Sequence, residues 1–387
     1  MLRSGSVTEL HVAEFFAGIG LARLGLEAAG AEVLWANDIS AKKSAMYRTH
    51  FGEEDTEHSF HLGDLGDVRS EDMPSHIDLA WASFPCTDLS LAGTRGGLRG
   101  SSSSAFWHFI KRISGMGISR PKVIAIENVT AFVSSRTGRD IRFAIKALNG
   151  LGYSVDLLSM DARRFVPQSR PRLFMIAMLE PPQSAAVESP LRPKFLQHLF
   201  DDEELLTHQG FVPEPPPLLR AGLTALADDI PATDDRWWGE SKVLKFTDSL
   251  SELQLSRLQS LKSEDATVFR TAYRRMRSGV ARWEMRPDDI AGCLRTASGG
   301  SSRQAMVRVG GGEVRIRWMT TTEYAKLMGA QGYVMNGVSQ QDAYFGFGDA
   351  VCVPVVKWLT ENYLIPYSSS CNVQSLSEWD GLNAASA

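Results

Sequence analysis

Two short stretches place a thiol and a carboxyl group where each could take part in catalysis. Cys86 stands in SFPCTDLS, directly after Pro85, which fixes a backbone dihedral and so the direction of the thiol. A thiol needs a nearby positive charge or helix N-terminus before its pKa falls enough for attack at neutral pH. Glu127 ends the apolar run VIAIE, where burial would raise the pKa of a carboxyl group and let it donate a proton. Taken alone, Cys86 could equally be a small buried hydrophobe, and Glu127 a cap of the next helix.

Two sets of arginines could bind anionic or polar groups. Arg170 and Arg172 stand two residues apart in VPQSRPRLFMI, so an extended chain points both guanidiniums to one face. Such a face suits a phosphate, or a carboxylate together with a base oxygen, although a solvated strand edge has the same pattern. The stretch FRTAYRRMRSGVARWEMR indicates phosphate contacts with apolar wedges, or else a solvated face. Its basic and aromatic residues are Arg270, Arg274, Arg275, Arg277, Arg282 and Arg286, with Tyr273 and Trp283 among them.

A glycine-bearing turn, FAGIG at residues 16–20, stands between an apolar run and a helical pattern. Glycine lets the backbone approach a ligand closely, and the start of a helix supplies free N–H groups. Arg23 occupies the third glycine position of the dinucleotide fingerprint, so the turn does not match that motif. Asp38, at the end of the next apolar run, could hold ribose hydroxyls or cap a helix. Asp64 in HLGDLGDV could meet an exocyclic amine or only make a turn.

Alternating strand and helix patterns must position these residues. We expect strands near residues 11–17, 31–38, 77–84, 121–128, 153–162 and 170–179, and helices near residues 21–30, 40–51, 104–116 and 139–152. Such alternation predicts a doubly wound α/β fold, with a largely parallel sheet and helices on both faces. Ligands of these sheets bind outside the carboxyl ends of the strands, which is where the turn, Asp38, Cys86 and Glu127 fall.

Composition limits the class of protein. The 387 residues suffice for one large α/β domain and a smaller one, and 43% hydrophobic with 22% charged residues is typical of soluble globular proteins. We find no apolar stretch long enough to span a membrane and no signal-peptide pattern, so we expect no membrane partner. The four cysteines fit neither a metal site nor a disulfide framework, which predicts free thiols in a reducing compartment and no bound metal. A net charge of -4 argues against a uniformly basic coat but allows a local basic surface.

The ordered set of motifs resembles the DNA cytosine-5 methyltransferase family. FAGIG, SFPCTDLS, IENV and VPQSRPR occur in that family's order, and RTASGGSSRQ, LMGAQGY and FGFGDAV resemble its closing segments. The resemblance covers residues 10–182 and 287–365. It implies a Rossmann-like sheet that binds S-adenosylmethionine (AdoMet), over residues 1–182 and 287–367, and a smaller inserted target-recognition domain. We expect that domain over residues 183–286, where the regular pattern is lost, and a disordered tail over residues 368–387.

The resemblance also implies roles for individual residues. Cys86 would attack carbon 6 of a target cytosine, Glu127 would hydrogen-bond its N3 and exocyclic amine, and Arg172 would hold its O2. Arg170 would support Glu127 and the active-site loop. The residues implied to contact AdoMet are Phe16, Gly18, Gly20, Leu21, Asp38, Asp64, Leu65, Pro85, Phe106, Asp349 and Val351. The residues implied to contact DNA are Arg270, Arg274, Arg275, Arg277, Arg282 and Arg303.

By this resemblance the chain methylates carbon 5 of a flipped-out cytosine in double-stranded DNA, through a covalent adduct between Cys86 and carbon 6. Methylation of transfer RNA is the alternative, but an insertion of about a hundred residues favours a reader of duplex sequence. We expect a cytoplasmic, nucleoid-associated monomer of a bacterium or phage, with a restriction endonuclease as a candidate partner. Intact Cys86, Glu127 and Arg172 argue against a regulatory relative without catalysis, and Arg23 argues against a nicotinamide-dependent oxidoreductase.

Two residues depart from the family pattern. Leu21 stands where many relatives carry a further glycine, and we expect it to alter packing only. Asp349 stands where the family usually has asparagine, beside the methionine end of the cofactor. The added negative charge could retune the affinity for AdoMet, or it could signal a different cofactor preference.

Overall fold

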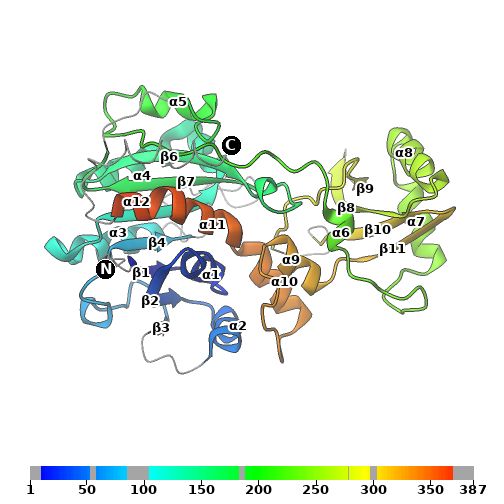
Figure 1. Cartoon of the computed structure of the whole chain (residues 1–387), viewed down its shortest axis with the longest axis horizontal. Coiled ribbons are helices and arrows are strands. Elements are labelled where there is room, and N and C mark those ends of the chain that lie inside the picture. Colours follow the sequence, from blue (N-terminus) through cyan, green and yellow to red (C-terminus); the bar gives the residue numbers. More distant parts are fainter. Residues whose placement is uncertain are drawn as a thin grey trace, which may run out of the picture.

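The computed structural model describes residues 10–52, 58–84, 104–182, 188–277, 279–296 and 303–368, whose strands form two sheets (Figure 1). The larger sheet contains β1 (Leu10–Phe15), β2 (Ala31–Asp38), β3 (Ser59–Leu62), β4 (Leu79–Ala82), β5 (Val123–Val129), β6 (Ser154–Asp161) and β7 (Pro171–Met178). The smaller sheet contains β8 (Val268–Arg277), β9 (Val280–Met285), β10 (Ala305–Gly310) and β11 (Glu313–Trp318).

The larger sheet has the strand order β3-β2-β1-β4-β5-β7-β6. Strands β1 to β5 pair in parallel, whereas β7 runs antiparallel to both of its neighbours, β5 and β6. Residues 162–170 join β6 to β7, and a connection this short permits a hairpin but not the crossover that parallel strands need. The predicted α/β fold with a largely parallel sheet is confirmed, with one antiparallel strand beside β5.

Helices cover both faces of the larger sheet because successive side chains of a strand point to opposite faces. On β1, Val12 packs with α1 (Leu21–Ala28) and α11 (Val353–Leu359), whereas Phe15 packs on the other face with α3 (Ser104–Gly115) and α4 (Arg139–Gly150). The other α-helices associated with the larger sheet are α2 (Ala41–Phe51), α5 (Lys194–Phe200), α9 (Thr321–Leu327), α10 (Gln340–Asp349) and α12 (Ile365–Ser368). Its short 3-10 and π turns are η1 (Ser70–Asp72), η4 (Gly117–Ser119), η5 (Thr130–Gly138), η6 (Ala162–Arg164) and η7 (Thr360–Leu364).

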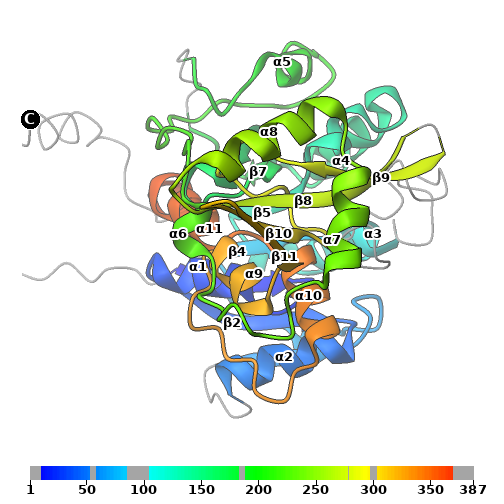
Figure 2. The same ribbon diagram turned by 90° about the vertical axis from the view of Figure 1, so that its right-hand side faces the viewer.

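The smaller sheet is antiparallel, with the strand order β11-β10-β8-β9, and α6 (Leu223–Leu226) lies beside β8. Helices α7 (Glu240–Asp248) and α8 (Glu252–Ser263) cover its outer face, where Phe246, Leu258 and Ile316 form a separate apolar core (Figure 2). The expected boundaries differ from this arrangement in two places. Strands β10 and β11 extend the smaller sheet beyond residue 286, and α5 packs Leu196 and Leu199 into the core of the larger sheet.

A buried ion pair joins the smaller sheet to α9. Arg317 of β11 and Glu323 of α9 are both almost fully buried, and two hydrogen bonds of 2.5 and 2.7 Å link the guanidinium to the carboxylate. Glu323 also accepts the backbone N–H of Asp228 and, with Thr320, forms the capping box that starts α9. The smaller sheet is therefore fixed to the larger part at the first turn of α9.

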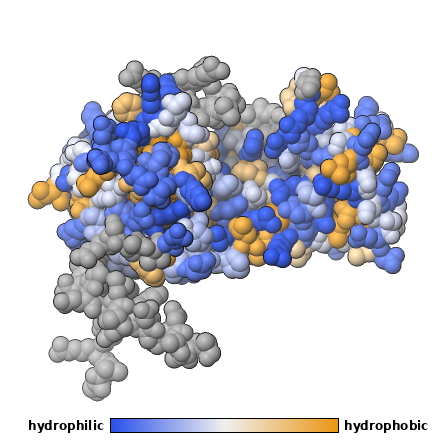
Figure 3. All heavy atoms as spheres, turned by 90° about the horizontal axis from the view of Figure 1, so that it is seen from above, coloured by the Kyte–Doolittle hydropathy of each residue, from blue (hydrophilic) through white to orange (hydrophobic). Residues whose placement is uncertain are grey.

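Hydrophilic side chains cover most of the face seen in Figure 3, and its apolar residues form small, separate groups. In the described part of the chain, every helix is too short or too polar to cross a membrane.

Replacing Glu323 by alanine should lower the free energy of unfolding by about 3 kcal/mol, because a buried guanidinium would lose its counter-charge. Urea denaturation measures this loss. The control is Glu313→Ala, which removes an exposed partner of Arg315 and should cost less than about 0.5 kcal/mol. Equal losses in the two variants would contradict the role of the buried pair.

Candidate functional site

An ion pair lies at the ends of β5 and β7. Arg172 Nε is 2.9 Å from Glu127 Oε1, and the exposed fractions of the two side chains are 16% and 9%. Antiparallel pairing places Arg172 opposite Val129, next to the end of β5. Burial raises the pKa of Glu127, although Arg172 and, more weakly, Arg170 oppose the rise. A carboxyl group held in this way can stay protonated at a higher pH than usual and donate a hydrogen bond.

Arg170 has a different environment from the one that the sequence predicted. Its guanidinium is buried and donates to the carbonyl oxygens of Leu294 at 2.7 Å, Gly348 at 3.1 Å and Ala350 at 2.6 Å. Among the described residues, the hydrogen bonds of this guanidinium go to those three carbonyls and to the Cys293 sulfur, so they do not support Glu127 directly. Arg170 precedes β7 and reaches the segments around residues 294 and 349, whereas Arg172 lies within the strand beside Glu127.

Cys293 lies between the two arginines and was missed by the sequence reasoning. Its sulfur is 3.5 Å from an Nη atom of Arg170 and 3.9 Å from one of Arg172. Burial alone would raise the pKa of this thiol, but the two guanidiniums outweigh burial and lower it. Both arginines thus do reach one common point, as their spacing predicted. Nothing in the local sequence around Cys293 signals this contact, because its partners are more than a hundred residues away.

The predicted nucleophile Cys86 and its neighbour Pro85 lie outside the described residues. The described chain ends at Phe84 before them and begins again at Ser104 after them. Phe84, two residues before Cys86, is buried, and its carbonyl oxygen accepts a hydrogen bond from Asn128 Nδ2 at 3.4 Å. Asn128 follows Glu127 directly, so the end of β5 is tied to the segment that leads to Cys86.

The glycine turn connects β1 to α1 and is held by Asp38. Phe16, Gly18 and Gly20 have φ angles of 59°, 62° and 79°, and glycine is the residue that adopts such angles without strain. Asp38 Oδ2 accepts the backbone N–H of Gly18 at 2.8 Å, and Oδ1 accepts that of Ser40 at 2.7 Å. Among the described residues, a Cβ atom placed on Gly18 would meet the stem of Lys43 alone, at 4.0 Å, so no described residue fills the space in front of the turn. Leu21 is buried at the start of α1.

Apolar and polar groups follow the ends of β2 and β3. Ile39, next to Asp38, is 68% exposed and was missed by the sequence reasoning. Asp64 Oδ1 accepts the backbone N–H of Gly66 at 2.7 Å and lies 3.2 Å from His108 Nδ1. Two further predicted contacts, Leu65 and Phe106, are buried, and the Phe106 ring packs 5.4 Å from that of Phe84. These two residues support the site from inside the core.

Asp349 and Val351, predicted to lie near the cofactor, belong to the end of α10 and the residues after it. Val351 is buried in the core beside α1. Asp349 Oδ2 is 2.8 Å from Lys43 Nζ of α2, and Oδ1 accepts a hydrogen bond from the Thr296 hydroxyl. Lys43 thereby joins the residues around the glycine turn, and no sequence pattern indicated it.

Four of the predicted DNA-contacting arginines share one hairpin. Strands β8 and β9 form it, and the exposed members are Arg274, Arg275, Arg277 and Arg282. Arg275 and Arg277 both pair with Glu284, at 3.3 and 2.6 Å, so one acid serves two guanidiniums. The hairpin therefore carries net positive charge on an exposed surface.

Two other predicted arginines are not exposed on the hairpin, and Trp283 packs with other aromatic rings: Arg270 lies on β8 but is largely buried, and Arg303 precedes β10. Arg270 is largely buried and contacts Asp289, while Arg303 donates to the Tyr344 hydroxyl at 2.6 Å. The Trp283 ring packs against Trp238 and other aromatic rings over the smaller sheet. The sequence pattern could not separate the inward-facing Arg270 and Trp283 from the exposed arginines, because all of them lie on β8 and β9.

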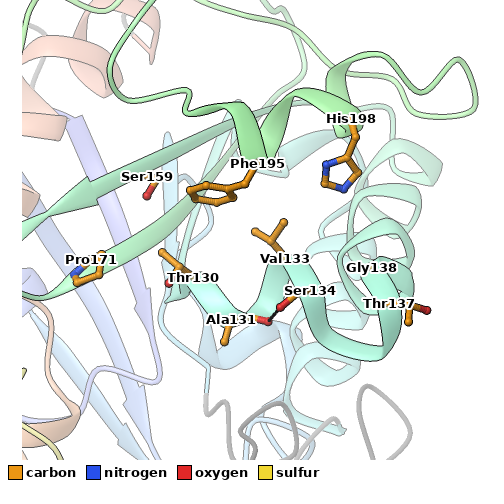
Figure 4. A pocket seen from close by; sticks show the side chains of 10 residues that line it. All are labelled: Thr130, Ala131, Val133, Ser134, Thr137, Gly138, Ser159, Pro171, Phe195 and His198. Carbon is orange, nitrogen blue, oxygen red and sulfur yellow. Dashed lines mark hydrogen bonds between the residues drawn. The ribbon is translucent and has the colours of Figure 1, made fainter.

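A cavity of about 680 Å³ opens beside the residues that follow Glu127. Thr130 and Val133 of η5 line one side, and Phe195 and His198 of α5 line the other (Figure 4). Pro171, between the two arginines of the VPQSRPR stretch, closes one end. None of the residues predicted to contact cofactor or DNA lines this cavity, so the sequence gives it no role.

A family model for "C-5 cytosine-specific DNA methylase" matches residues 10–364. Type II methyltransferase M.HhaI of Haemophilus parahaemolyticus is 30% identical over 176 residues, which are 45% of this chain and 51% of that protein. The chain thus spans about half the length of that relative. Type II methyltransferase M.Bsp6I of Bacillus sp. is 24% identical over 359 residues, 91% of this chain and 98% of that protein.

Solved structures share the fold. The Entamoeba histolytica methyltransferase EhMeth has a TM-score of 0.59 at 17% identity, with 92% of this chain and 97% of that chain covered. The Dnmt2 methyltransferase of S. pombe has a TM-score of 0.58 at 17% identity, with 92% and 98% covered. Identities this low establish the architecture of the chain and no more.

A buried acid behind the glycine turn should make stability depend on pH. Glu14 of β1 is 1% exposed, and its Oε2 has no hydrogen-bond partner in the described residues. Burial raises the pKa of Glu14 from its ordinary 4.5 to about 8, against the opposing charge of Arg23. In the unfolded chain Glu14 loses its proton near 4.5, whereas in the folded chain it keeps the proton up to about 8. Its contribution to stability is therefore complete below 4.5 and is lost as pH rises through 8.

The wild-type protein should accordingly lose stability faster than Glu14→Gln between pH 5 and 8, by about 1 kcal/mol per pH unit. Urea denaturation at a series of pH values measures both slopes. Parallel slopes in the two proteins would show that Glu14 is ionised in the folded state.

Proposed function

Because the chain belongs to the C-5 cytosine-specific DNA methylase family, we propose that it transfers a methyl group from AdoMet to carbon 5 of a cytosine flipped out of duplex DNA. The observation that carries this proposal is the buried pair of Glu127 and Arg172. The pair combines a carboxyl group of raised pKa with a guanidinium, at strand ends tied to the segment that leads to Cys86. A ring with an acceptor nitrogen and a carbonyl oxygen on one edge would match these two groups.

The residues around the glycine turn fit AdoMet. Gly18 borders space that none of the described residues fills, and Ile39 offers an exposed apolar surface for an adenine ring. Asp38 ends β2, the place where an acidic residue binds ribose hydroxyls in nucleotide folds. Asp64 Oδ2 has no partner in the described residues and could accept the exocyclic amine of adenine. When bound, AdoMet would supply an electrophilic methyl group carried by a sulfonium.

The chain's own residues would activate the cytosine. Carbon 5 is a weak nucleophile, so the Cys86 thiolate first adds to carbon 6 and forms a sulfur–carbon bond. Glu127 donates a hydrogen bond to N3 and stabilises the negative charge that this addition creates, while Arg172 orients Glu127 and holds O2. Carbon 5 would then take the methyl group as the bond between the methyl carbon and the sulfonium sulfur breaks, and the donor would leave as a neutral thioether. Loss of the carbon 5 proton to water and release of the Cys86 thiolate restore the aromatic ring.

Duplex DNA is the favoured substrate because the inserted part presents an exposed basic hairpin. Four arginines of β8 and β9 could contact phosphates or base edges. Methylation of transfer RNA is the second candidate. We extend the proposal to a monomer that works with a restriction endonuclease of the same specificity.

Incubation with labelled AdoMet and mixed-sequence DNA should place the label on carbon 5 of cytosine, and bisulfite sequencing should then show the target sequence. Label on RNA alone would contradict a DNA substrate. DNA with 5-fluorocytosine should trap the protein covalently, since its carbon 5 cannot lose a proton. Cys86→Ala should abolish this trapping, and Cys371→Ala is the matched control because it removes another thiol of the chain.

Substitution of the hairpin arginines should weaken binding to DNA uniformly over sequence. Arg275→Ala with Arg277→Ala should reduce the slope of log K against log salt by about 1 to 2, since each lost phosphate contact removes about 0.9. Fluorescence anisotropy at several salt concentrations measures the slope. Arg236→Ala removes an exposed arginine paired with Asp234 outside the hairpin and should leave the slope unchanged. A hairpin variant with an unchanged slope would show that DNA lies on another surface.

A further inference from the structure

Three polar side chains stand in one row at the amino ends of neighbouring strands of the larger sheet. His11 is the second residue of β1, Glu32 is the second residue of β2, and Asp78 directly precedes β4. Parallel pairing sets His11 opposite Glu32, and it sets the next residue of β1, Val12, opposite Leu79. Paired residues of a sheet point to the same face, so the imidazole lies between the two carboxylates.

The imidazole of His76 completes the group. His76 Nε2 is 3.6 Å from Asp78 Oδ1, and His11 Nδ1 is 4.0 Å from Asp78 Oδ2. His11 Nε2 is 3.4 Å from Glu32 Oε2. One donor atom from each of His11, His76 and Asp78 lies within 4.8 Å of the other two. Donor atoms around a tetrahedral zinc ion lie about 3.3 to 3.6 Å apart, so small side-chain rotations would bring all three to one ion.

The backbone orients the carboxylate at the centre of this group. Asp78 Oδ2 accepts the backbone N–H of His11 at 3.0 Å, and Asp78 donates its own N–H to the carbonyl oxygen of His11 at 2.9 Å. A ligand oriented in this way loses less conformational freedom when it binds. The side chains of His76, His11 and Asp78 are 76%, 34% and 22% exposed, so an ion can reach them from solvent.

Ion pairing between protonated histidines and the carboxylates is the competing explanation. His11 lies between Glu32 and Asp78 and could bind both as an imidazolium. The centroids of the His11 and His76 rings are 6.2 Å apart, with an angle of 84° between the rings. Two protonated rings this close would repel each other, whereas two neutral rings can each give a lone pair to one cation. The presence of both histidines therefore favours a shared ion.

We propose that His11, His76 and Asp78 bind one divalent first-row metal ion such as Zn²⁺, with Glu32 or water as the fourth ligand. Imidazole nitrogens suit zinc, copper and nickel, whereas magnesium and calcium prefer oxygen ligands. The expectation of no bound metal rested on the cysteines, and this ligand set contains none. Its members escaped notice in the sequence because Asp78 is 67 residues from His11.

The ion acts on stability and not on the transfer of a methyl group. His11 is at the amino end of β1, and the glycine turn follows the carboxyl end of the same strand. Glu127 likewise lies towards the carboxyl end of β5, which is parallel to β4. The metal site and the residues proposed for catalysis are thus at opposite edges of the sheet. An ion at His11 and Asp78 links β1 to the segment that enters β4, and it stabilises the folded chain by binding it.

Isothermal titration calorimetry of the metal-free, untagged full chain with zinc chloride tests the site. His76→Gln should weaken zinc binding at least about tenfold, because it removes one of three ligands, and its exposed position leaves folding intact. Asp78→Asn should weaken binding as well. His108→Gln is the matched control: it removes a histidine that is 3.2 Å from one carboxylate, that of Asp64, and it should bind zinc like the wild type. All variants keep the four cysteines, so binding to thiols is the same in each.

Thermal unfolding gives an independent measurement. Zinc in about a hundredfold excess over its Kd should raise the Tm of the wild type by about 3 to 5 °C, and that of His76→Gln by less than about 1 °C. Equal zinc affinity in the wild type and His76→Gln would overturn the site, and so would magnesium binding as tight as that of zinc. Methyl transfer that needs zinc in the wild type would overturn the purely stabilising role. Failure of all methyl transfer would overturn the proposed function and leave the metal site standing.

Discussion

The structure around the site depends on one buried guanidinium. Arg170 binds the carbonyl oxygens of Leu294, Gly348 and Ala350, which belong to two segments that lack regular strand or helix partners at these atoms. A buried carbonyl without a partner costs free energy, so these segments are stable in their present positions only while Arg170 is present. Arg170 also precedes Arg172 by two positions. This one short stretch of the chain therefore positions both Arg172, which contacts Glu127, and the segment that contains Asp349.

Much of the larger sheet could be predicted because each of its strands has a pattern within its own few residues. Short apolar runs with polar ends at Asp38 and Glu127 mark parallel strands, and the spacing of Arg170 and Arg172 indicated one shared face. Both guanidiniums indeed reach Cys293. The antiparallel direction of β7 follows from a connection too short for a crossover, which the apolar pattern alone does not show.

The parts that could not be predicted depend on partners distant in sequence. Lys43 and Asp349 are 306 residues apart, and a lysine in a helical pattern resembles any solvated side chain. The strands β10 and β11 have ordinary amphipathic patterns, so nothing local assigns them to the smaller sheet. Trp283 likewise stands among arginines in the sequence but packs with other aromatic rings. In each case the local sequence pattern is compatible with more than one structure, and contacts between residues distant in sequence determine which one forms.

The contacts at the joint between the two sheets have a consequence for how such proteins diversify. Asp289 accepts the backbone N–H groups of Gly222 and Thr224, and Glu323 accepts that of Asp228. The chain therefore leaves the larger part and returns to it through segments that are hydrogen-bonded to each other. A unit attached in this way can be exchanged as a cassette, with its two junctions kept in register. Such an exchange would leave the strand ends of the larger sheet, with Glu127 and Arg172, unchanged.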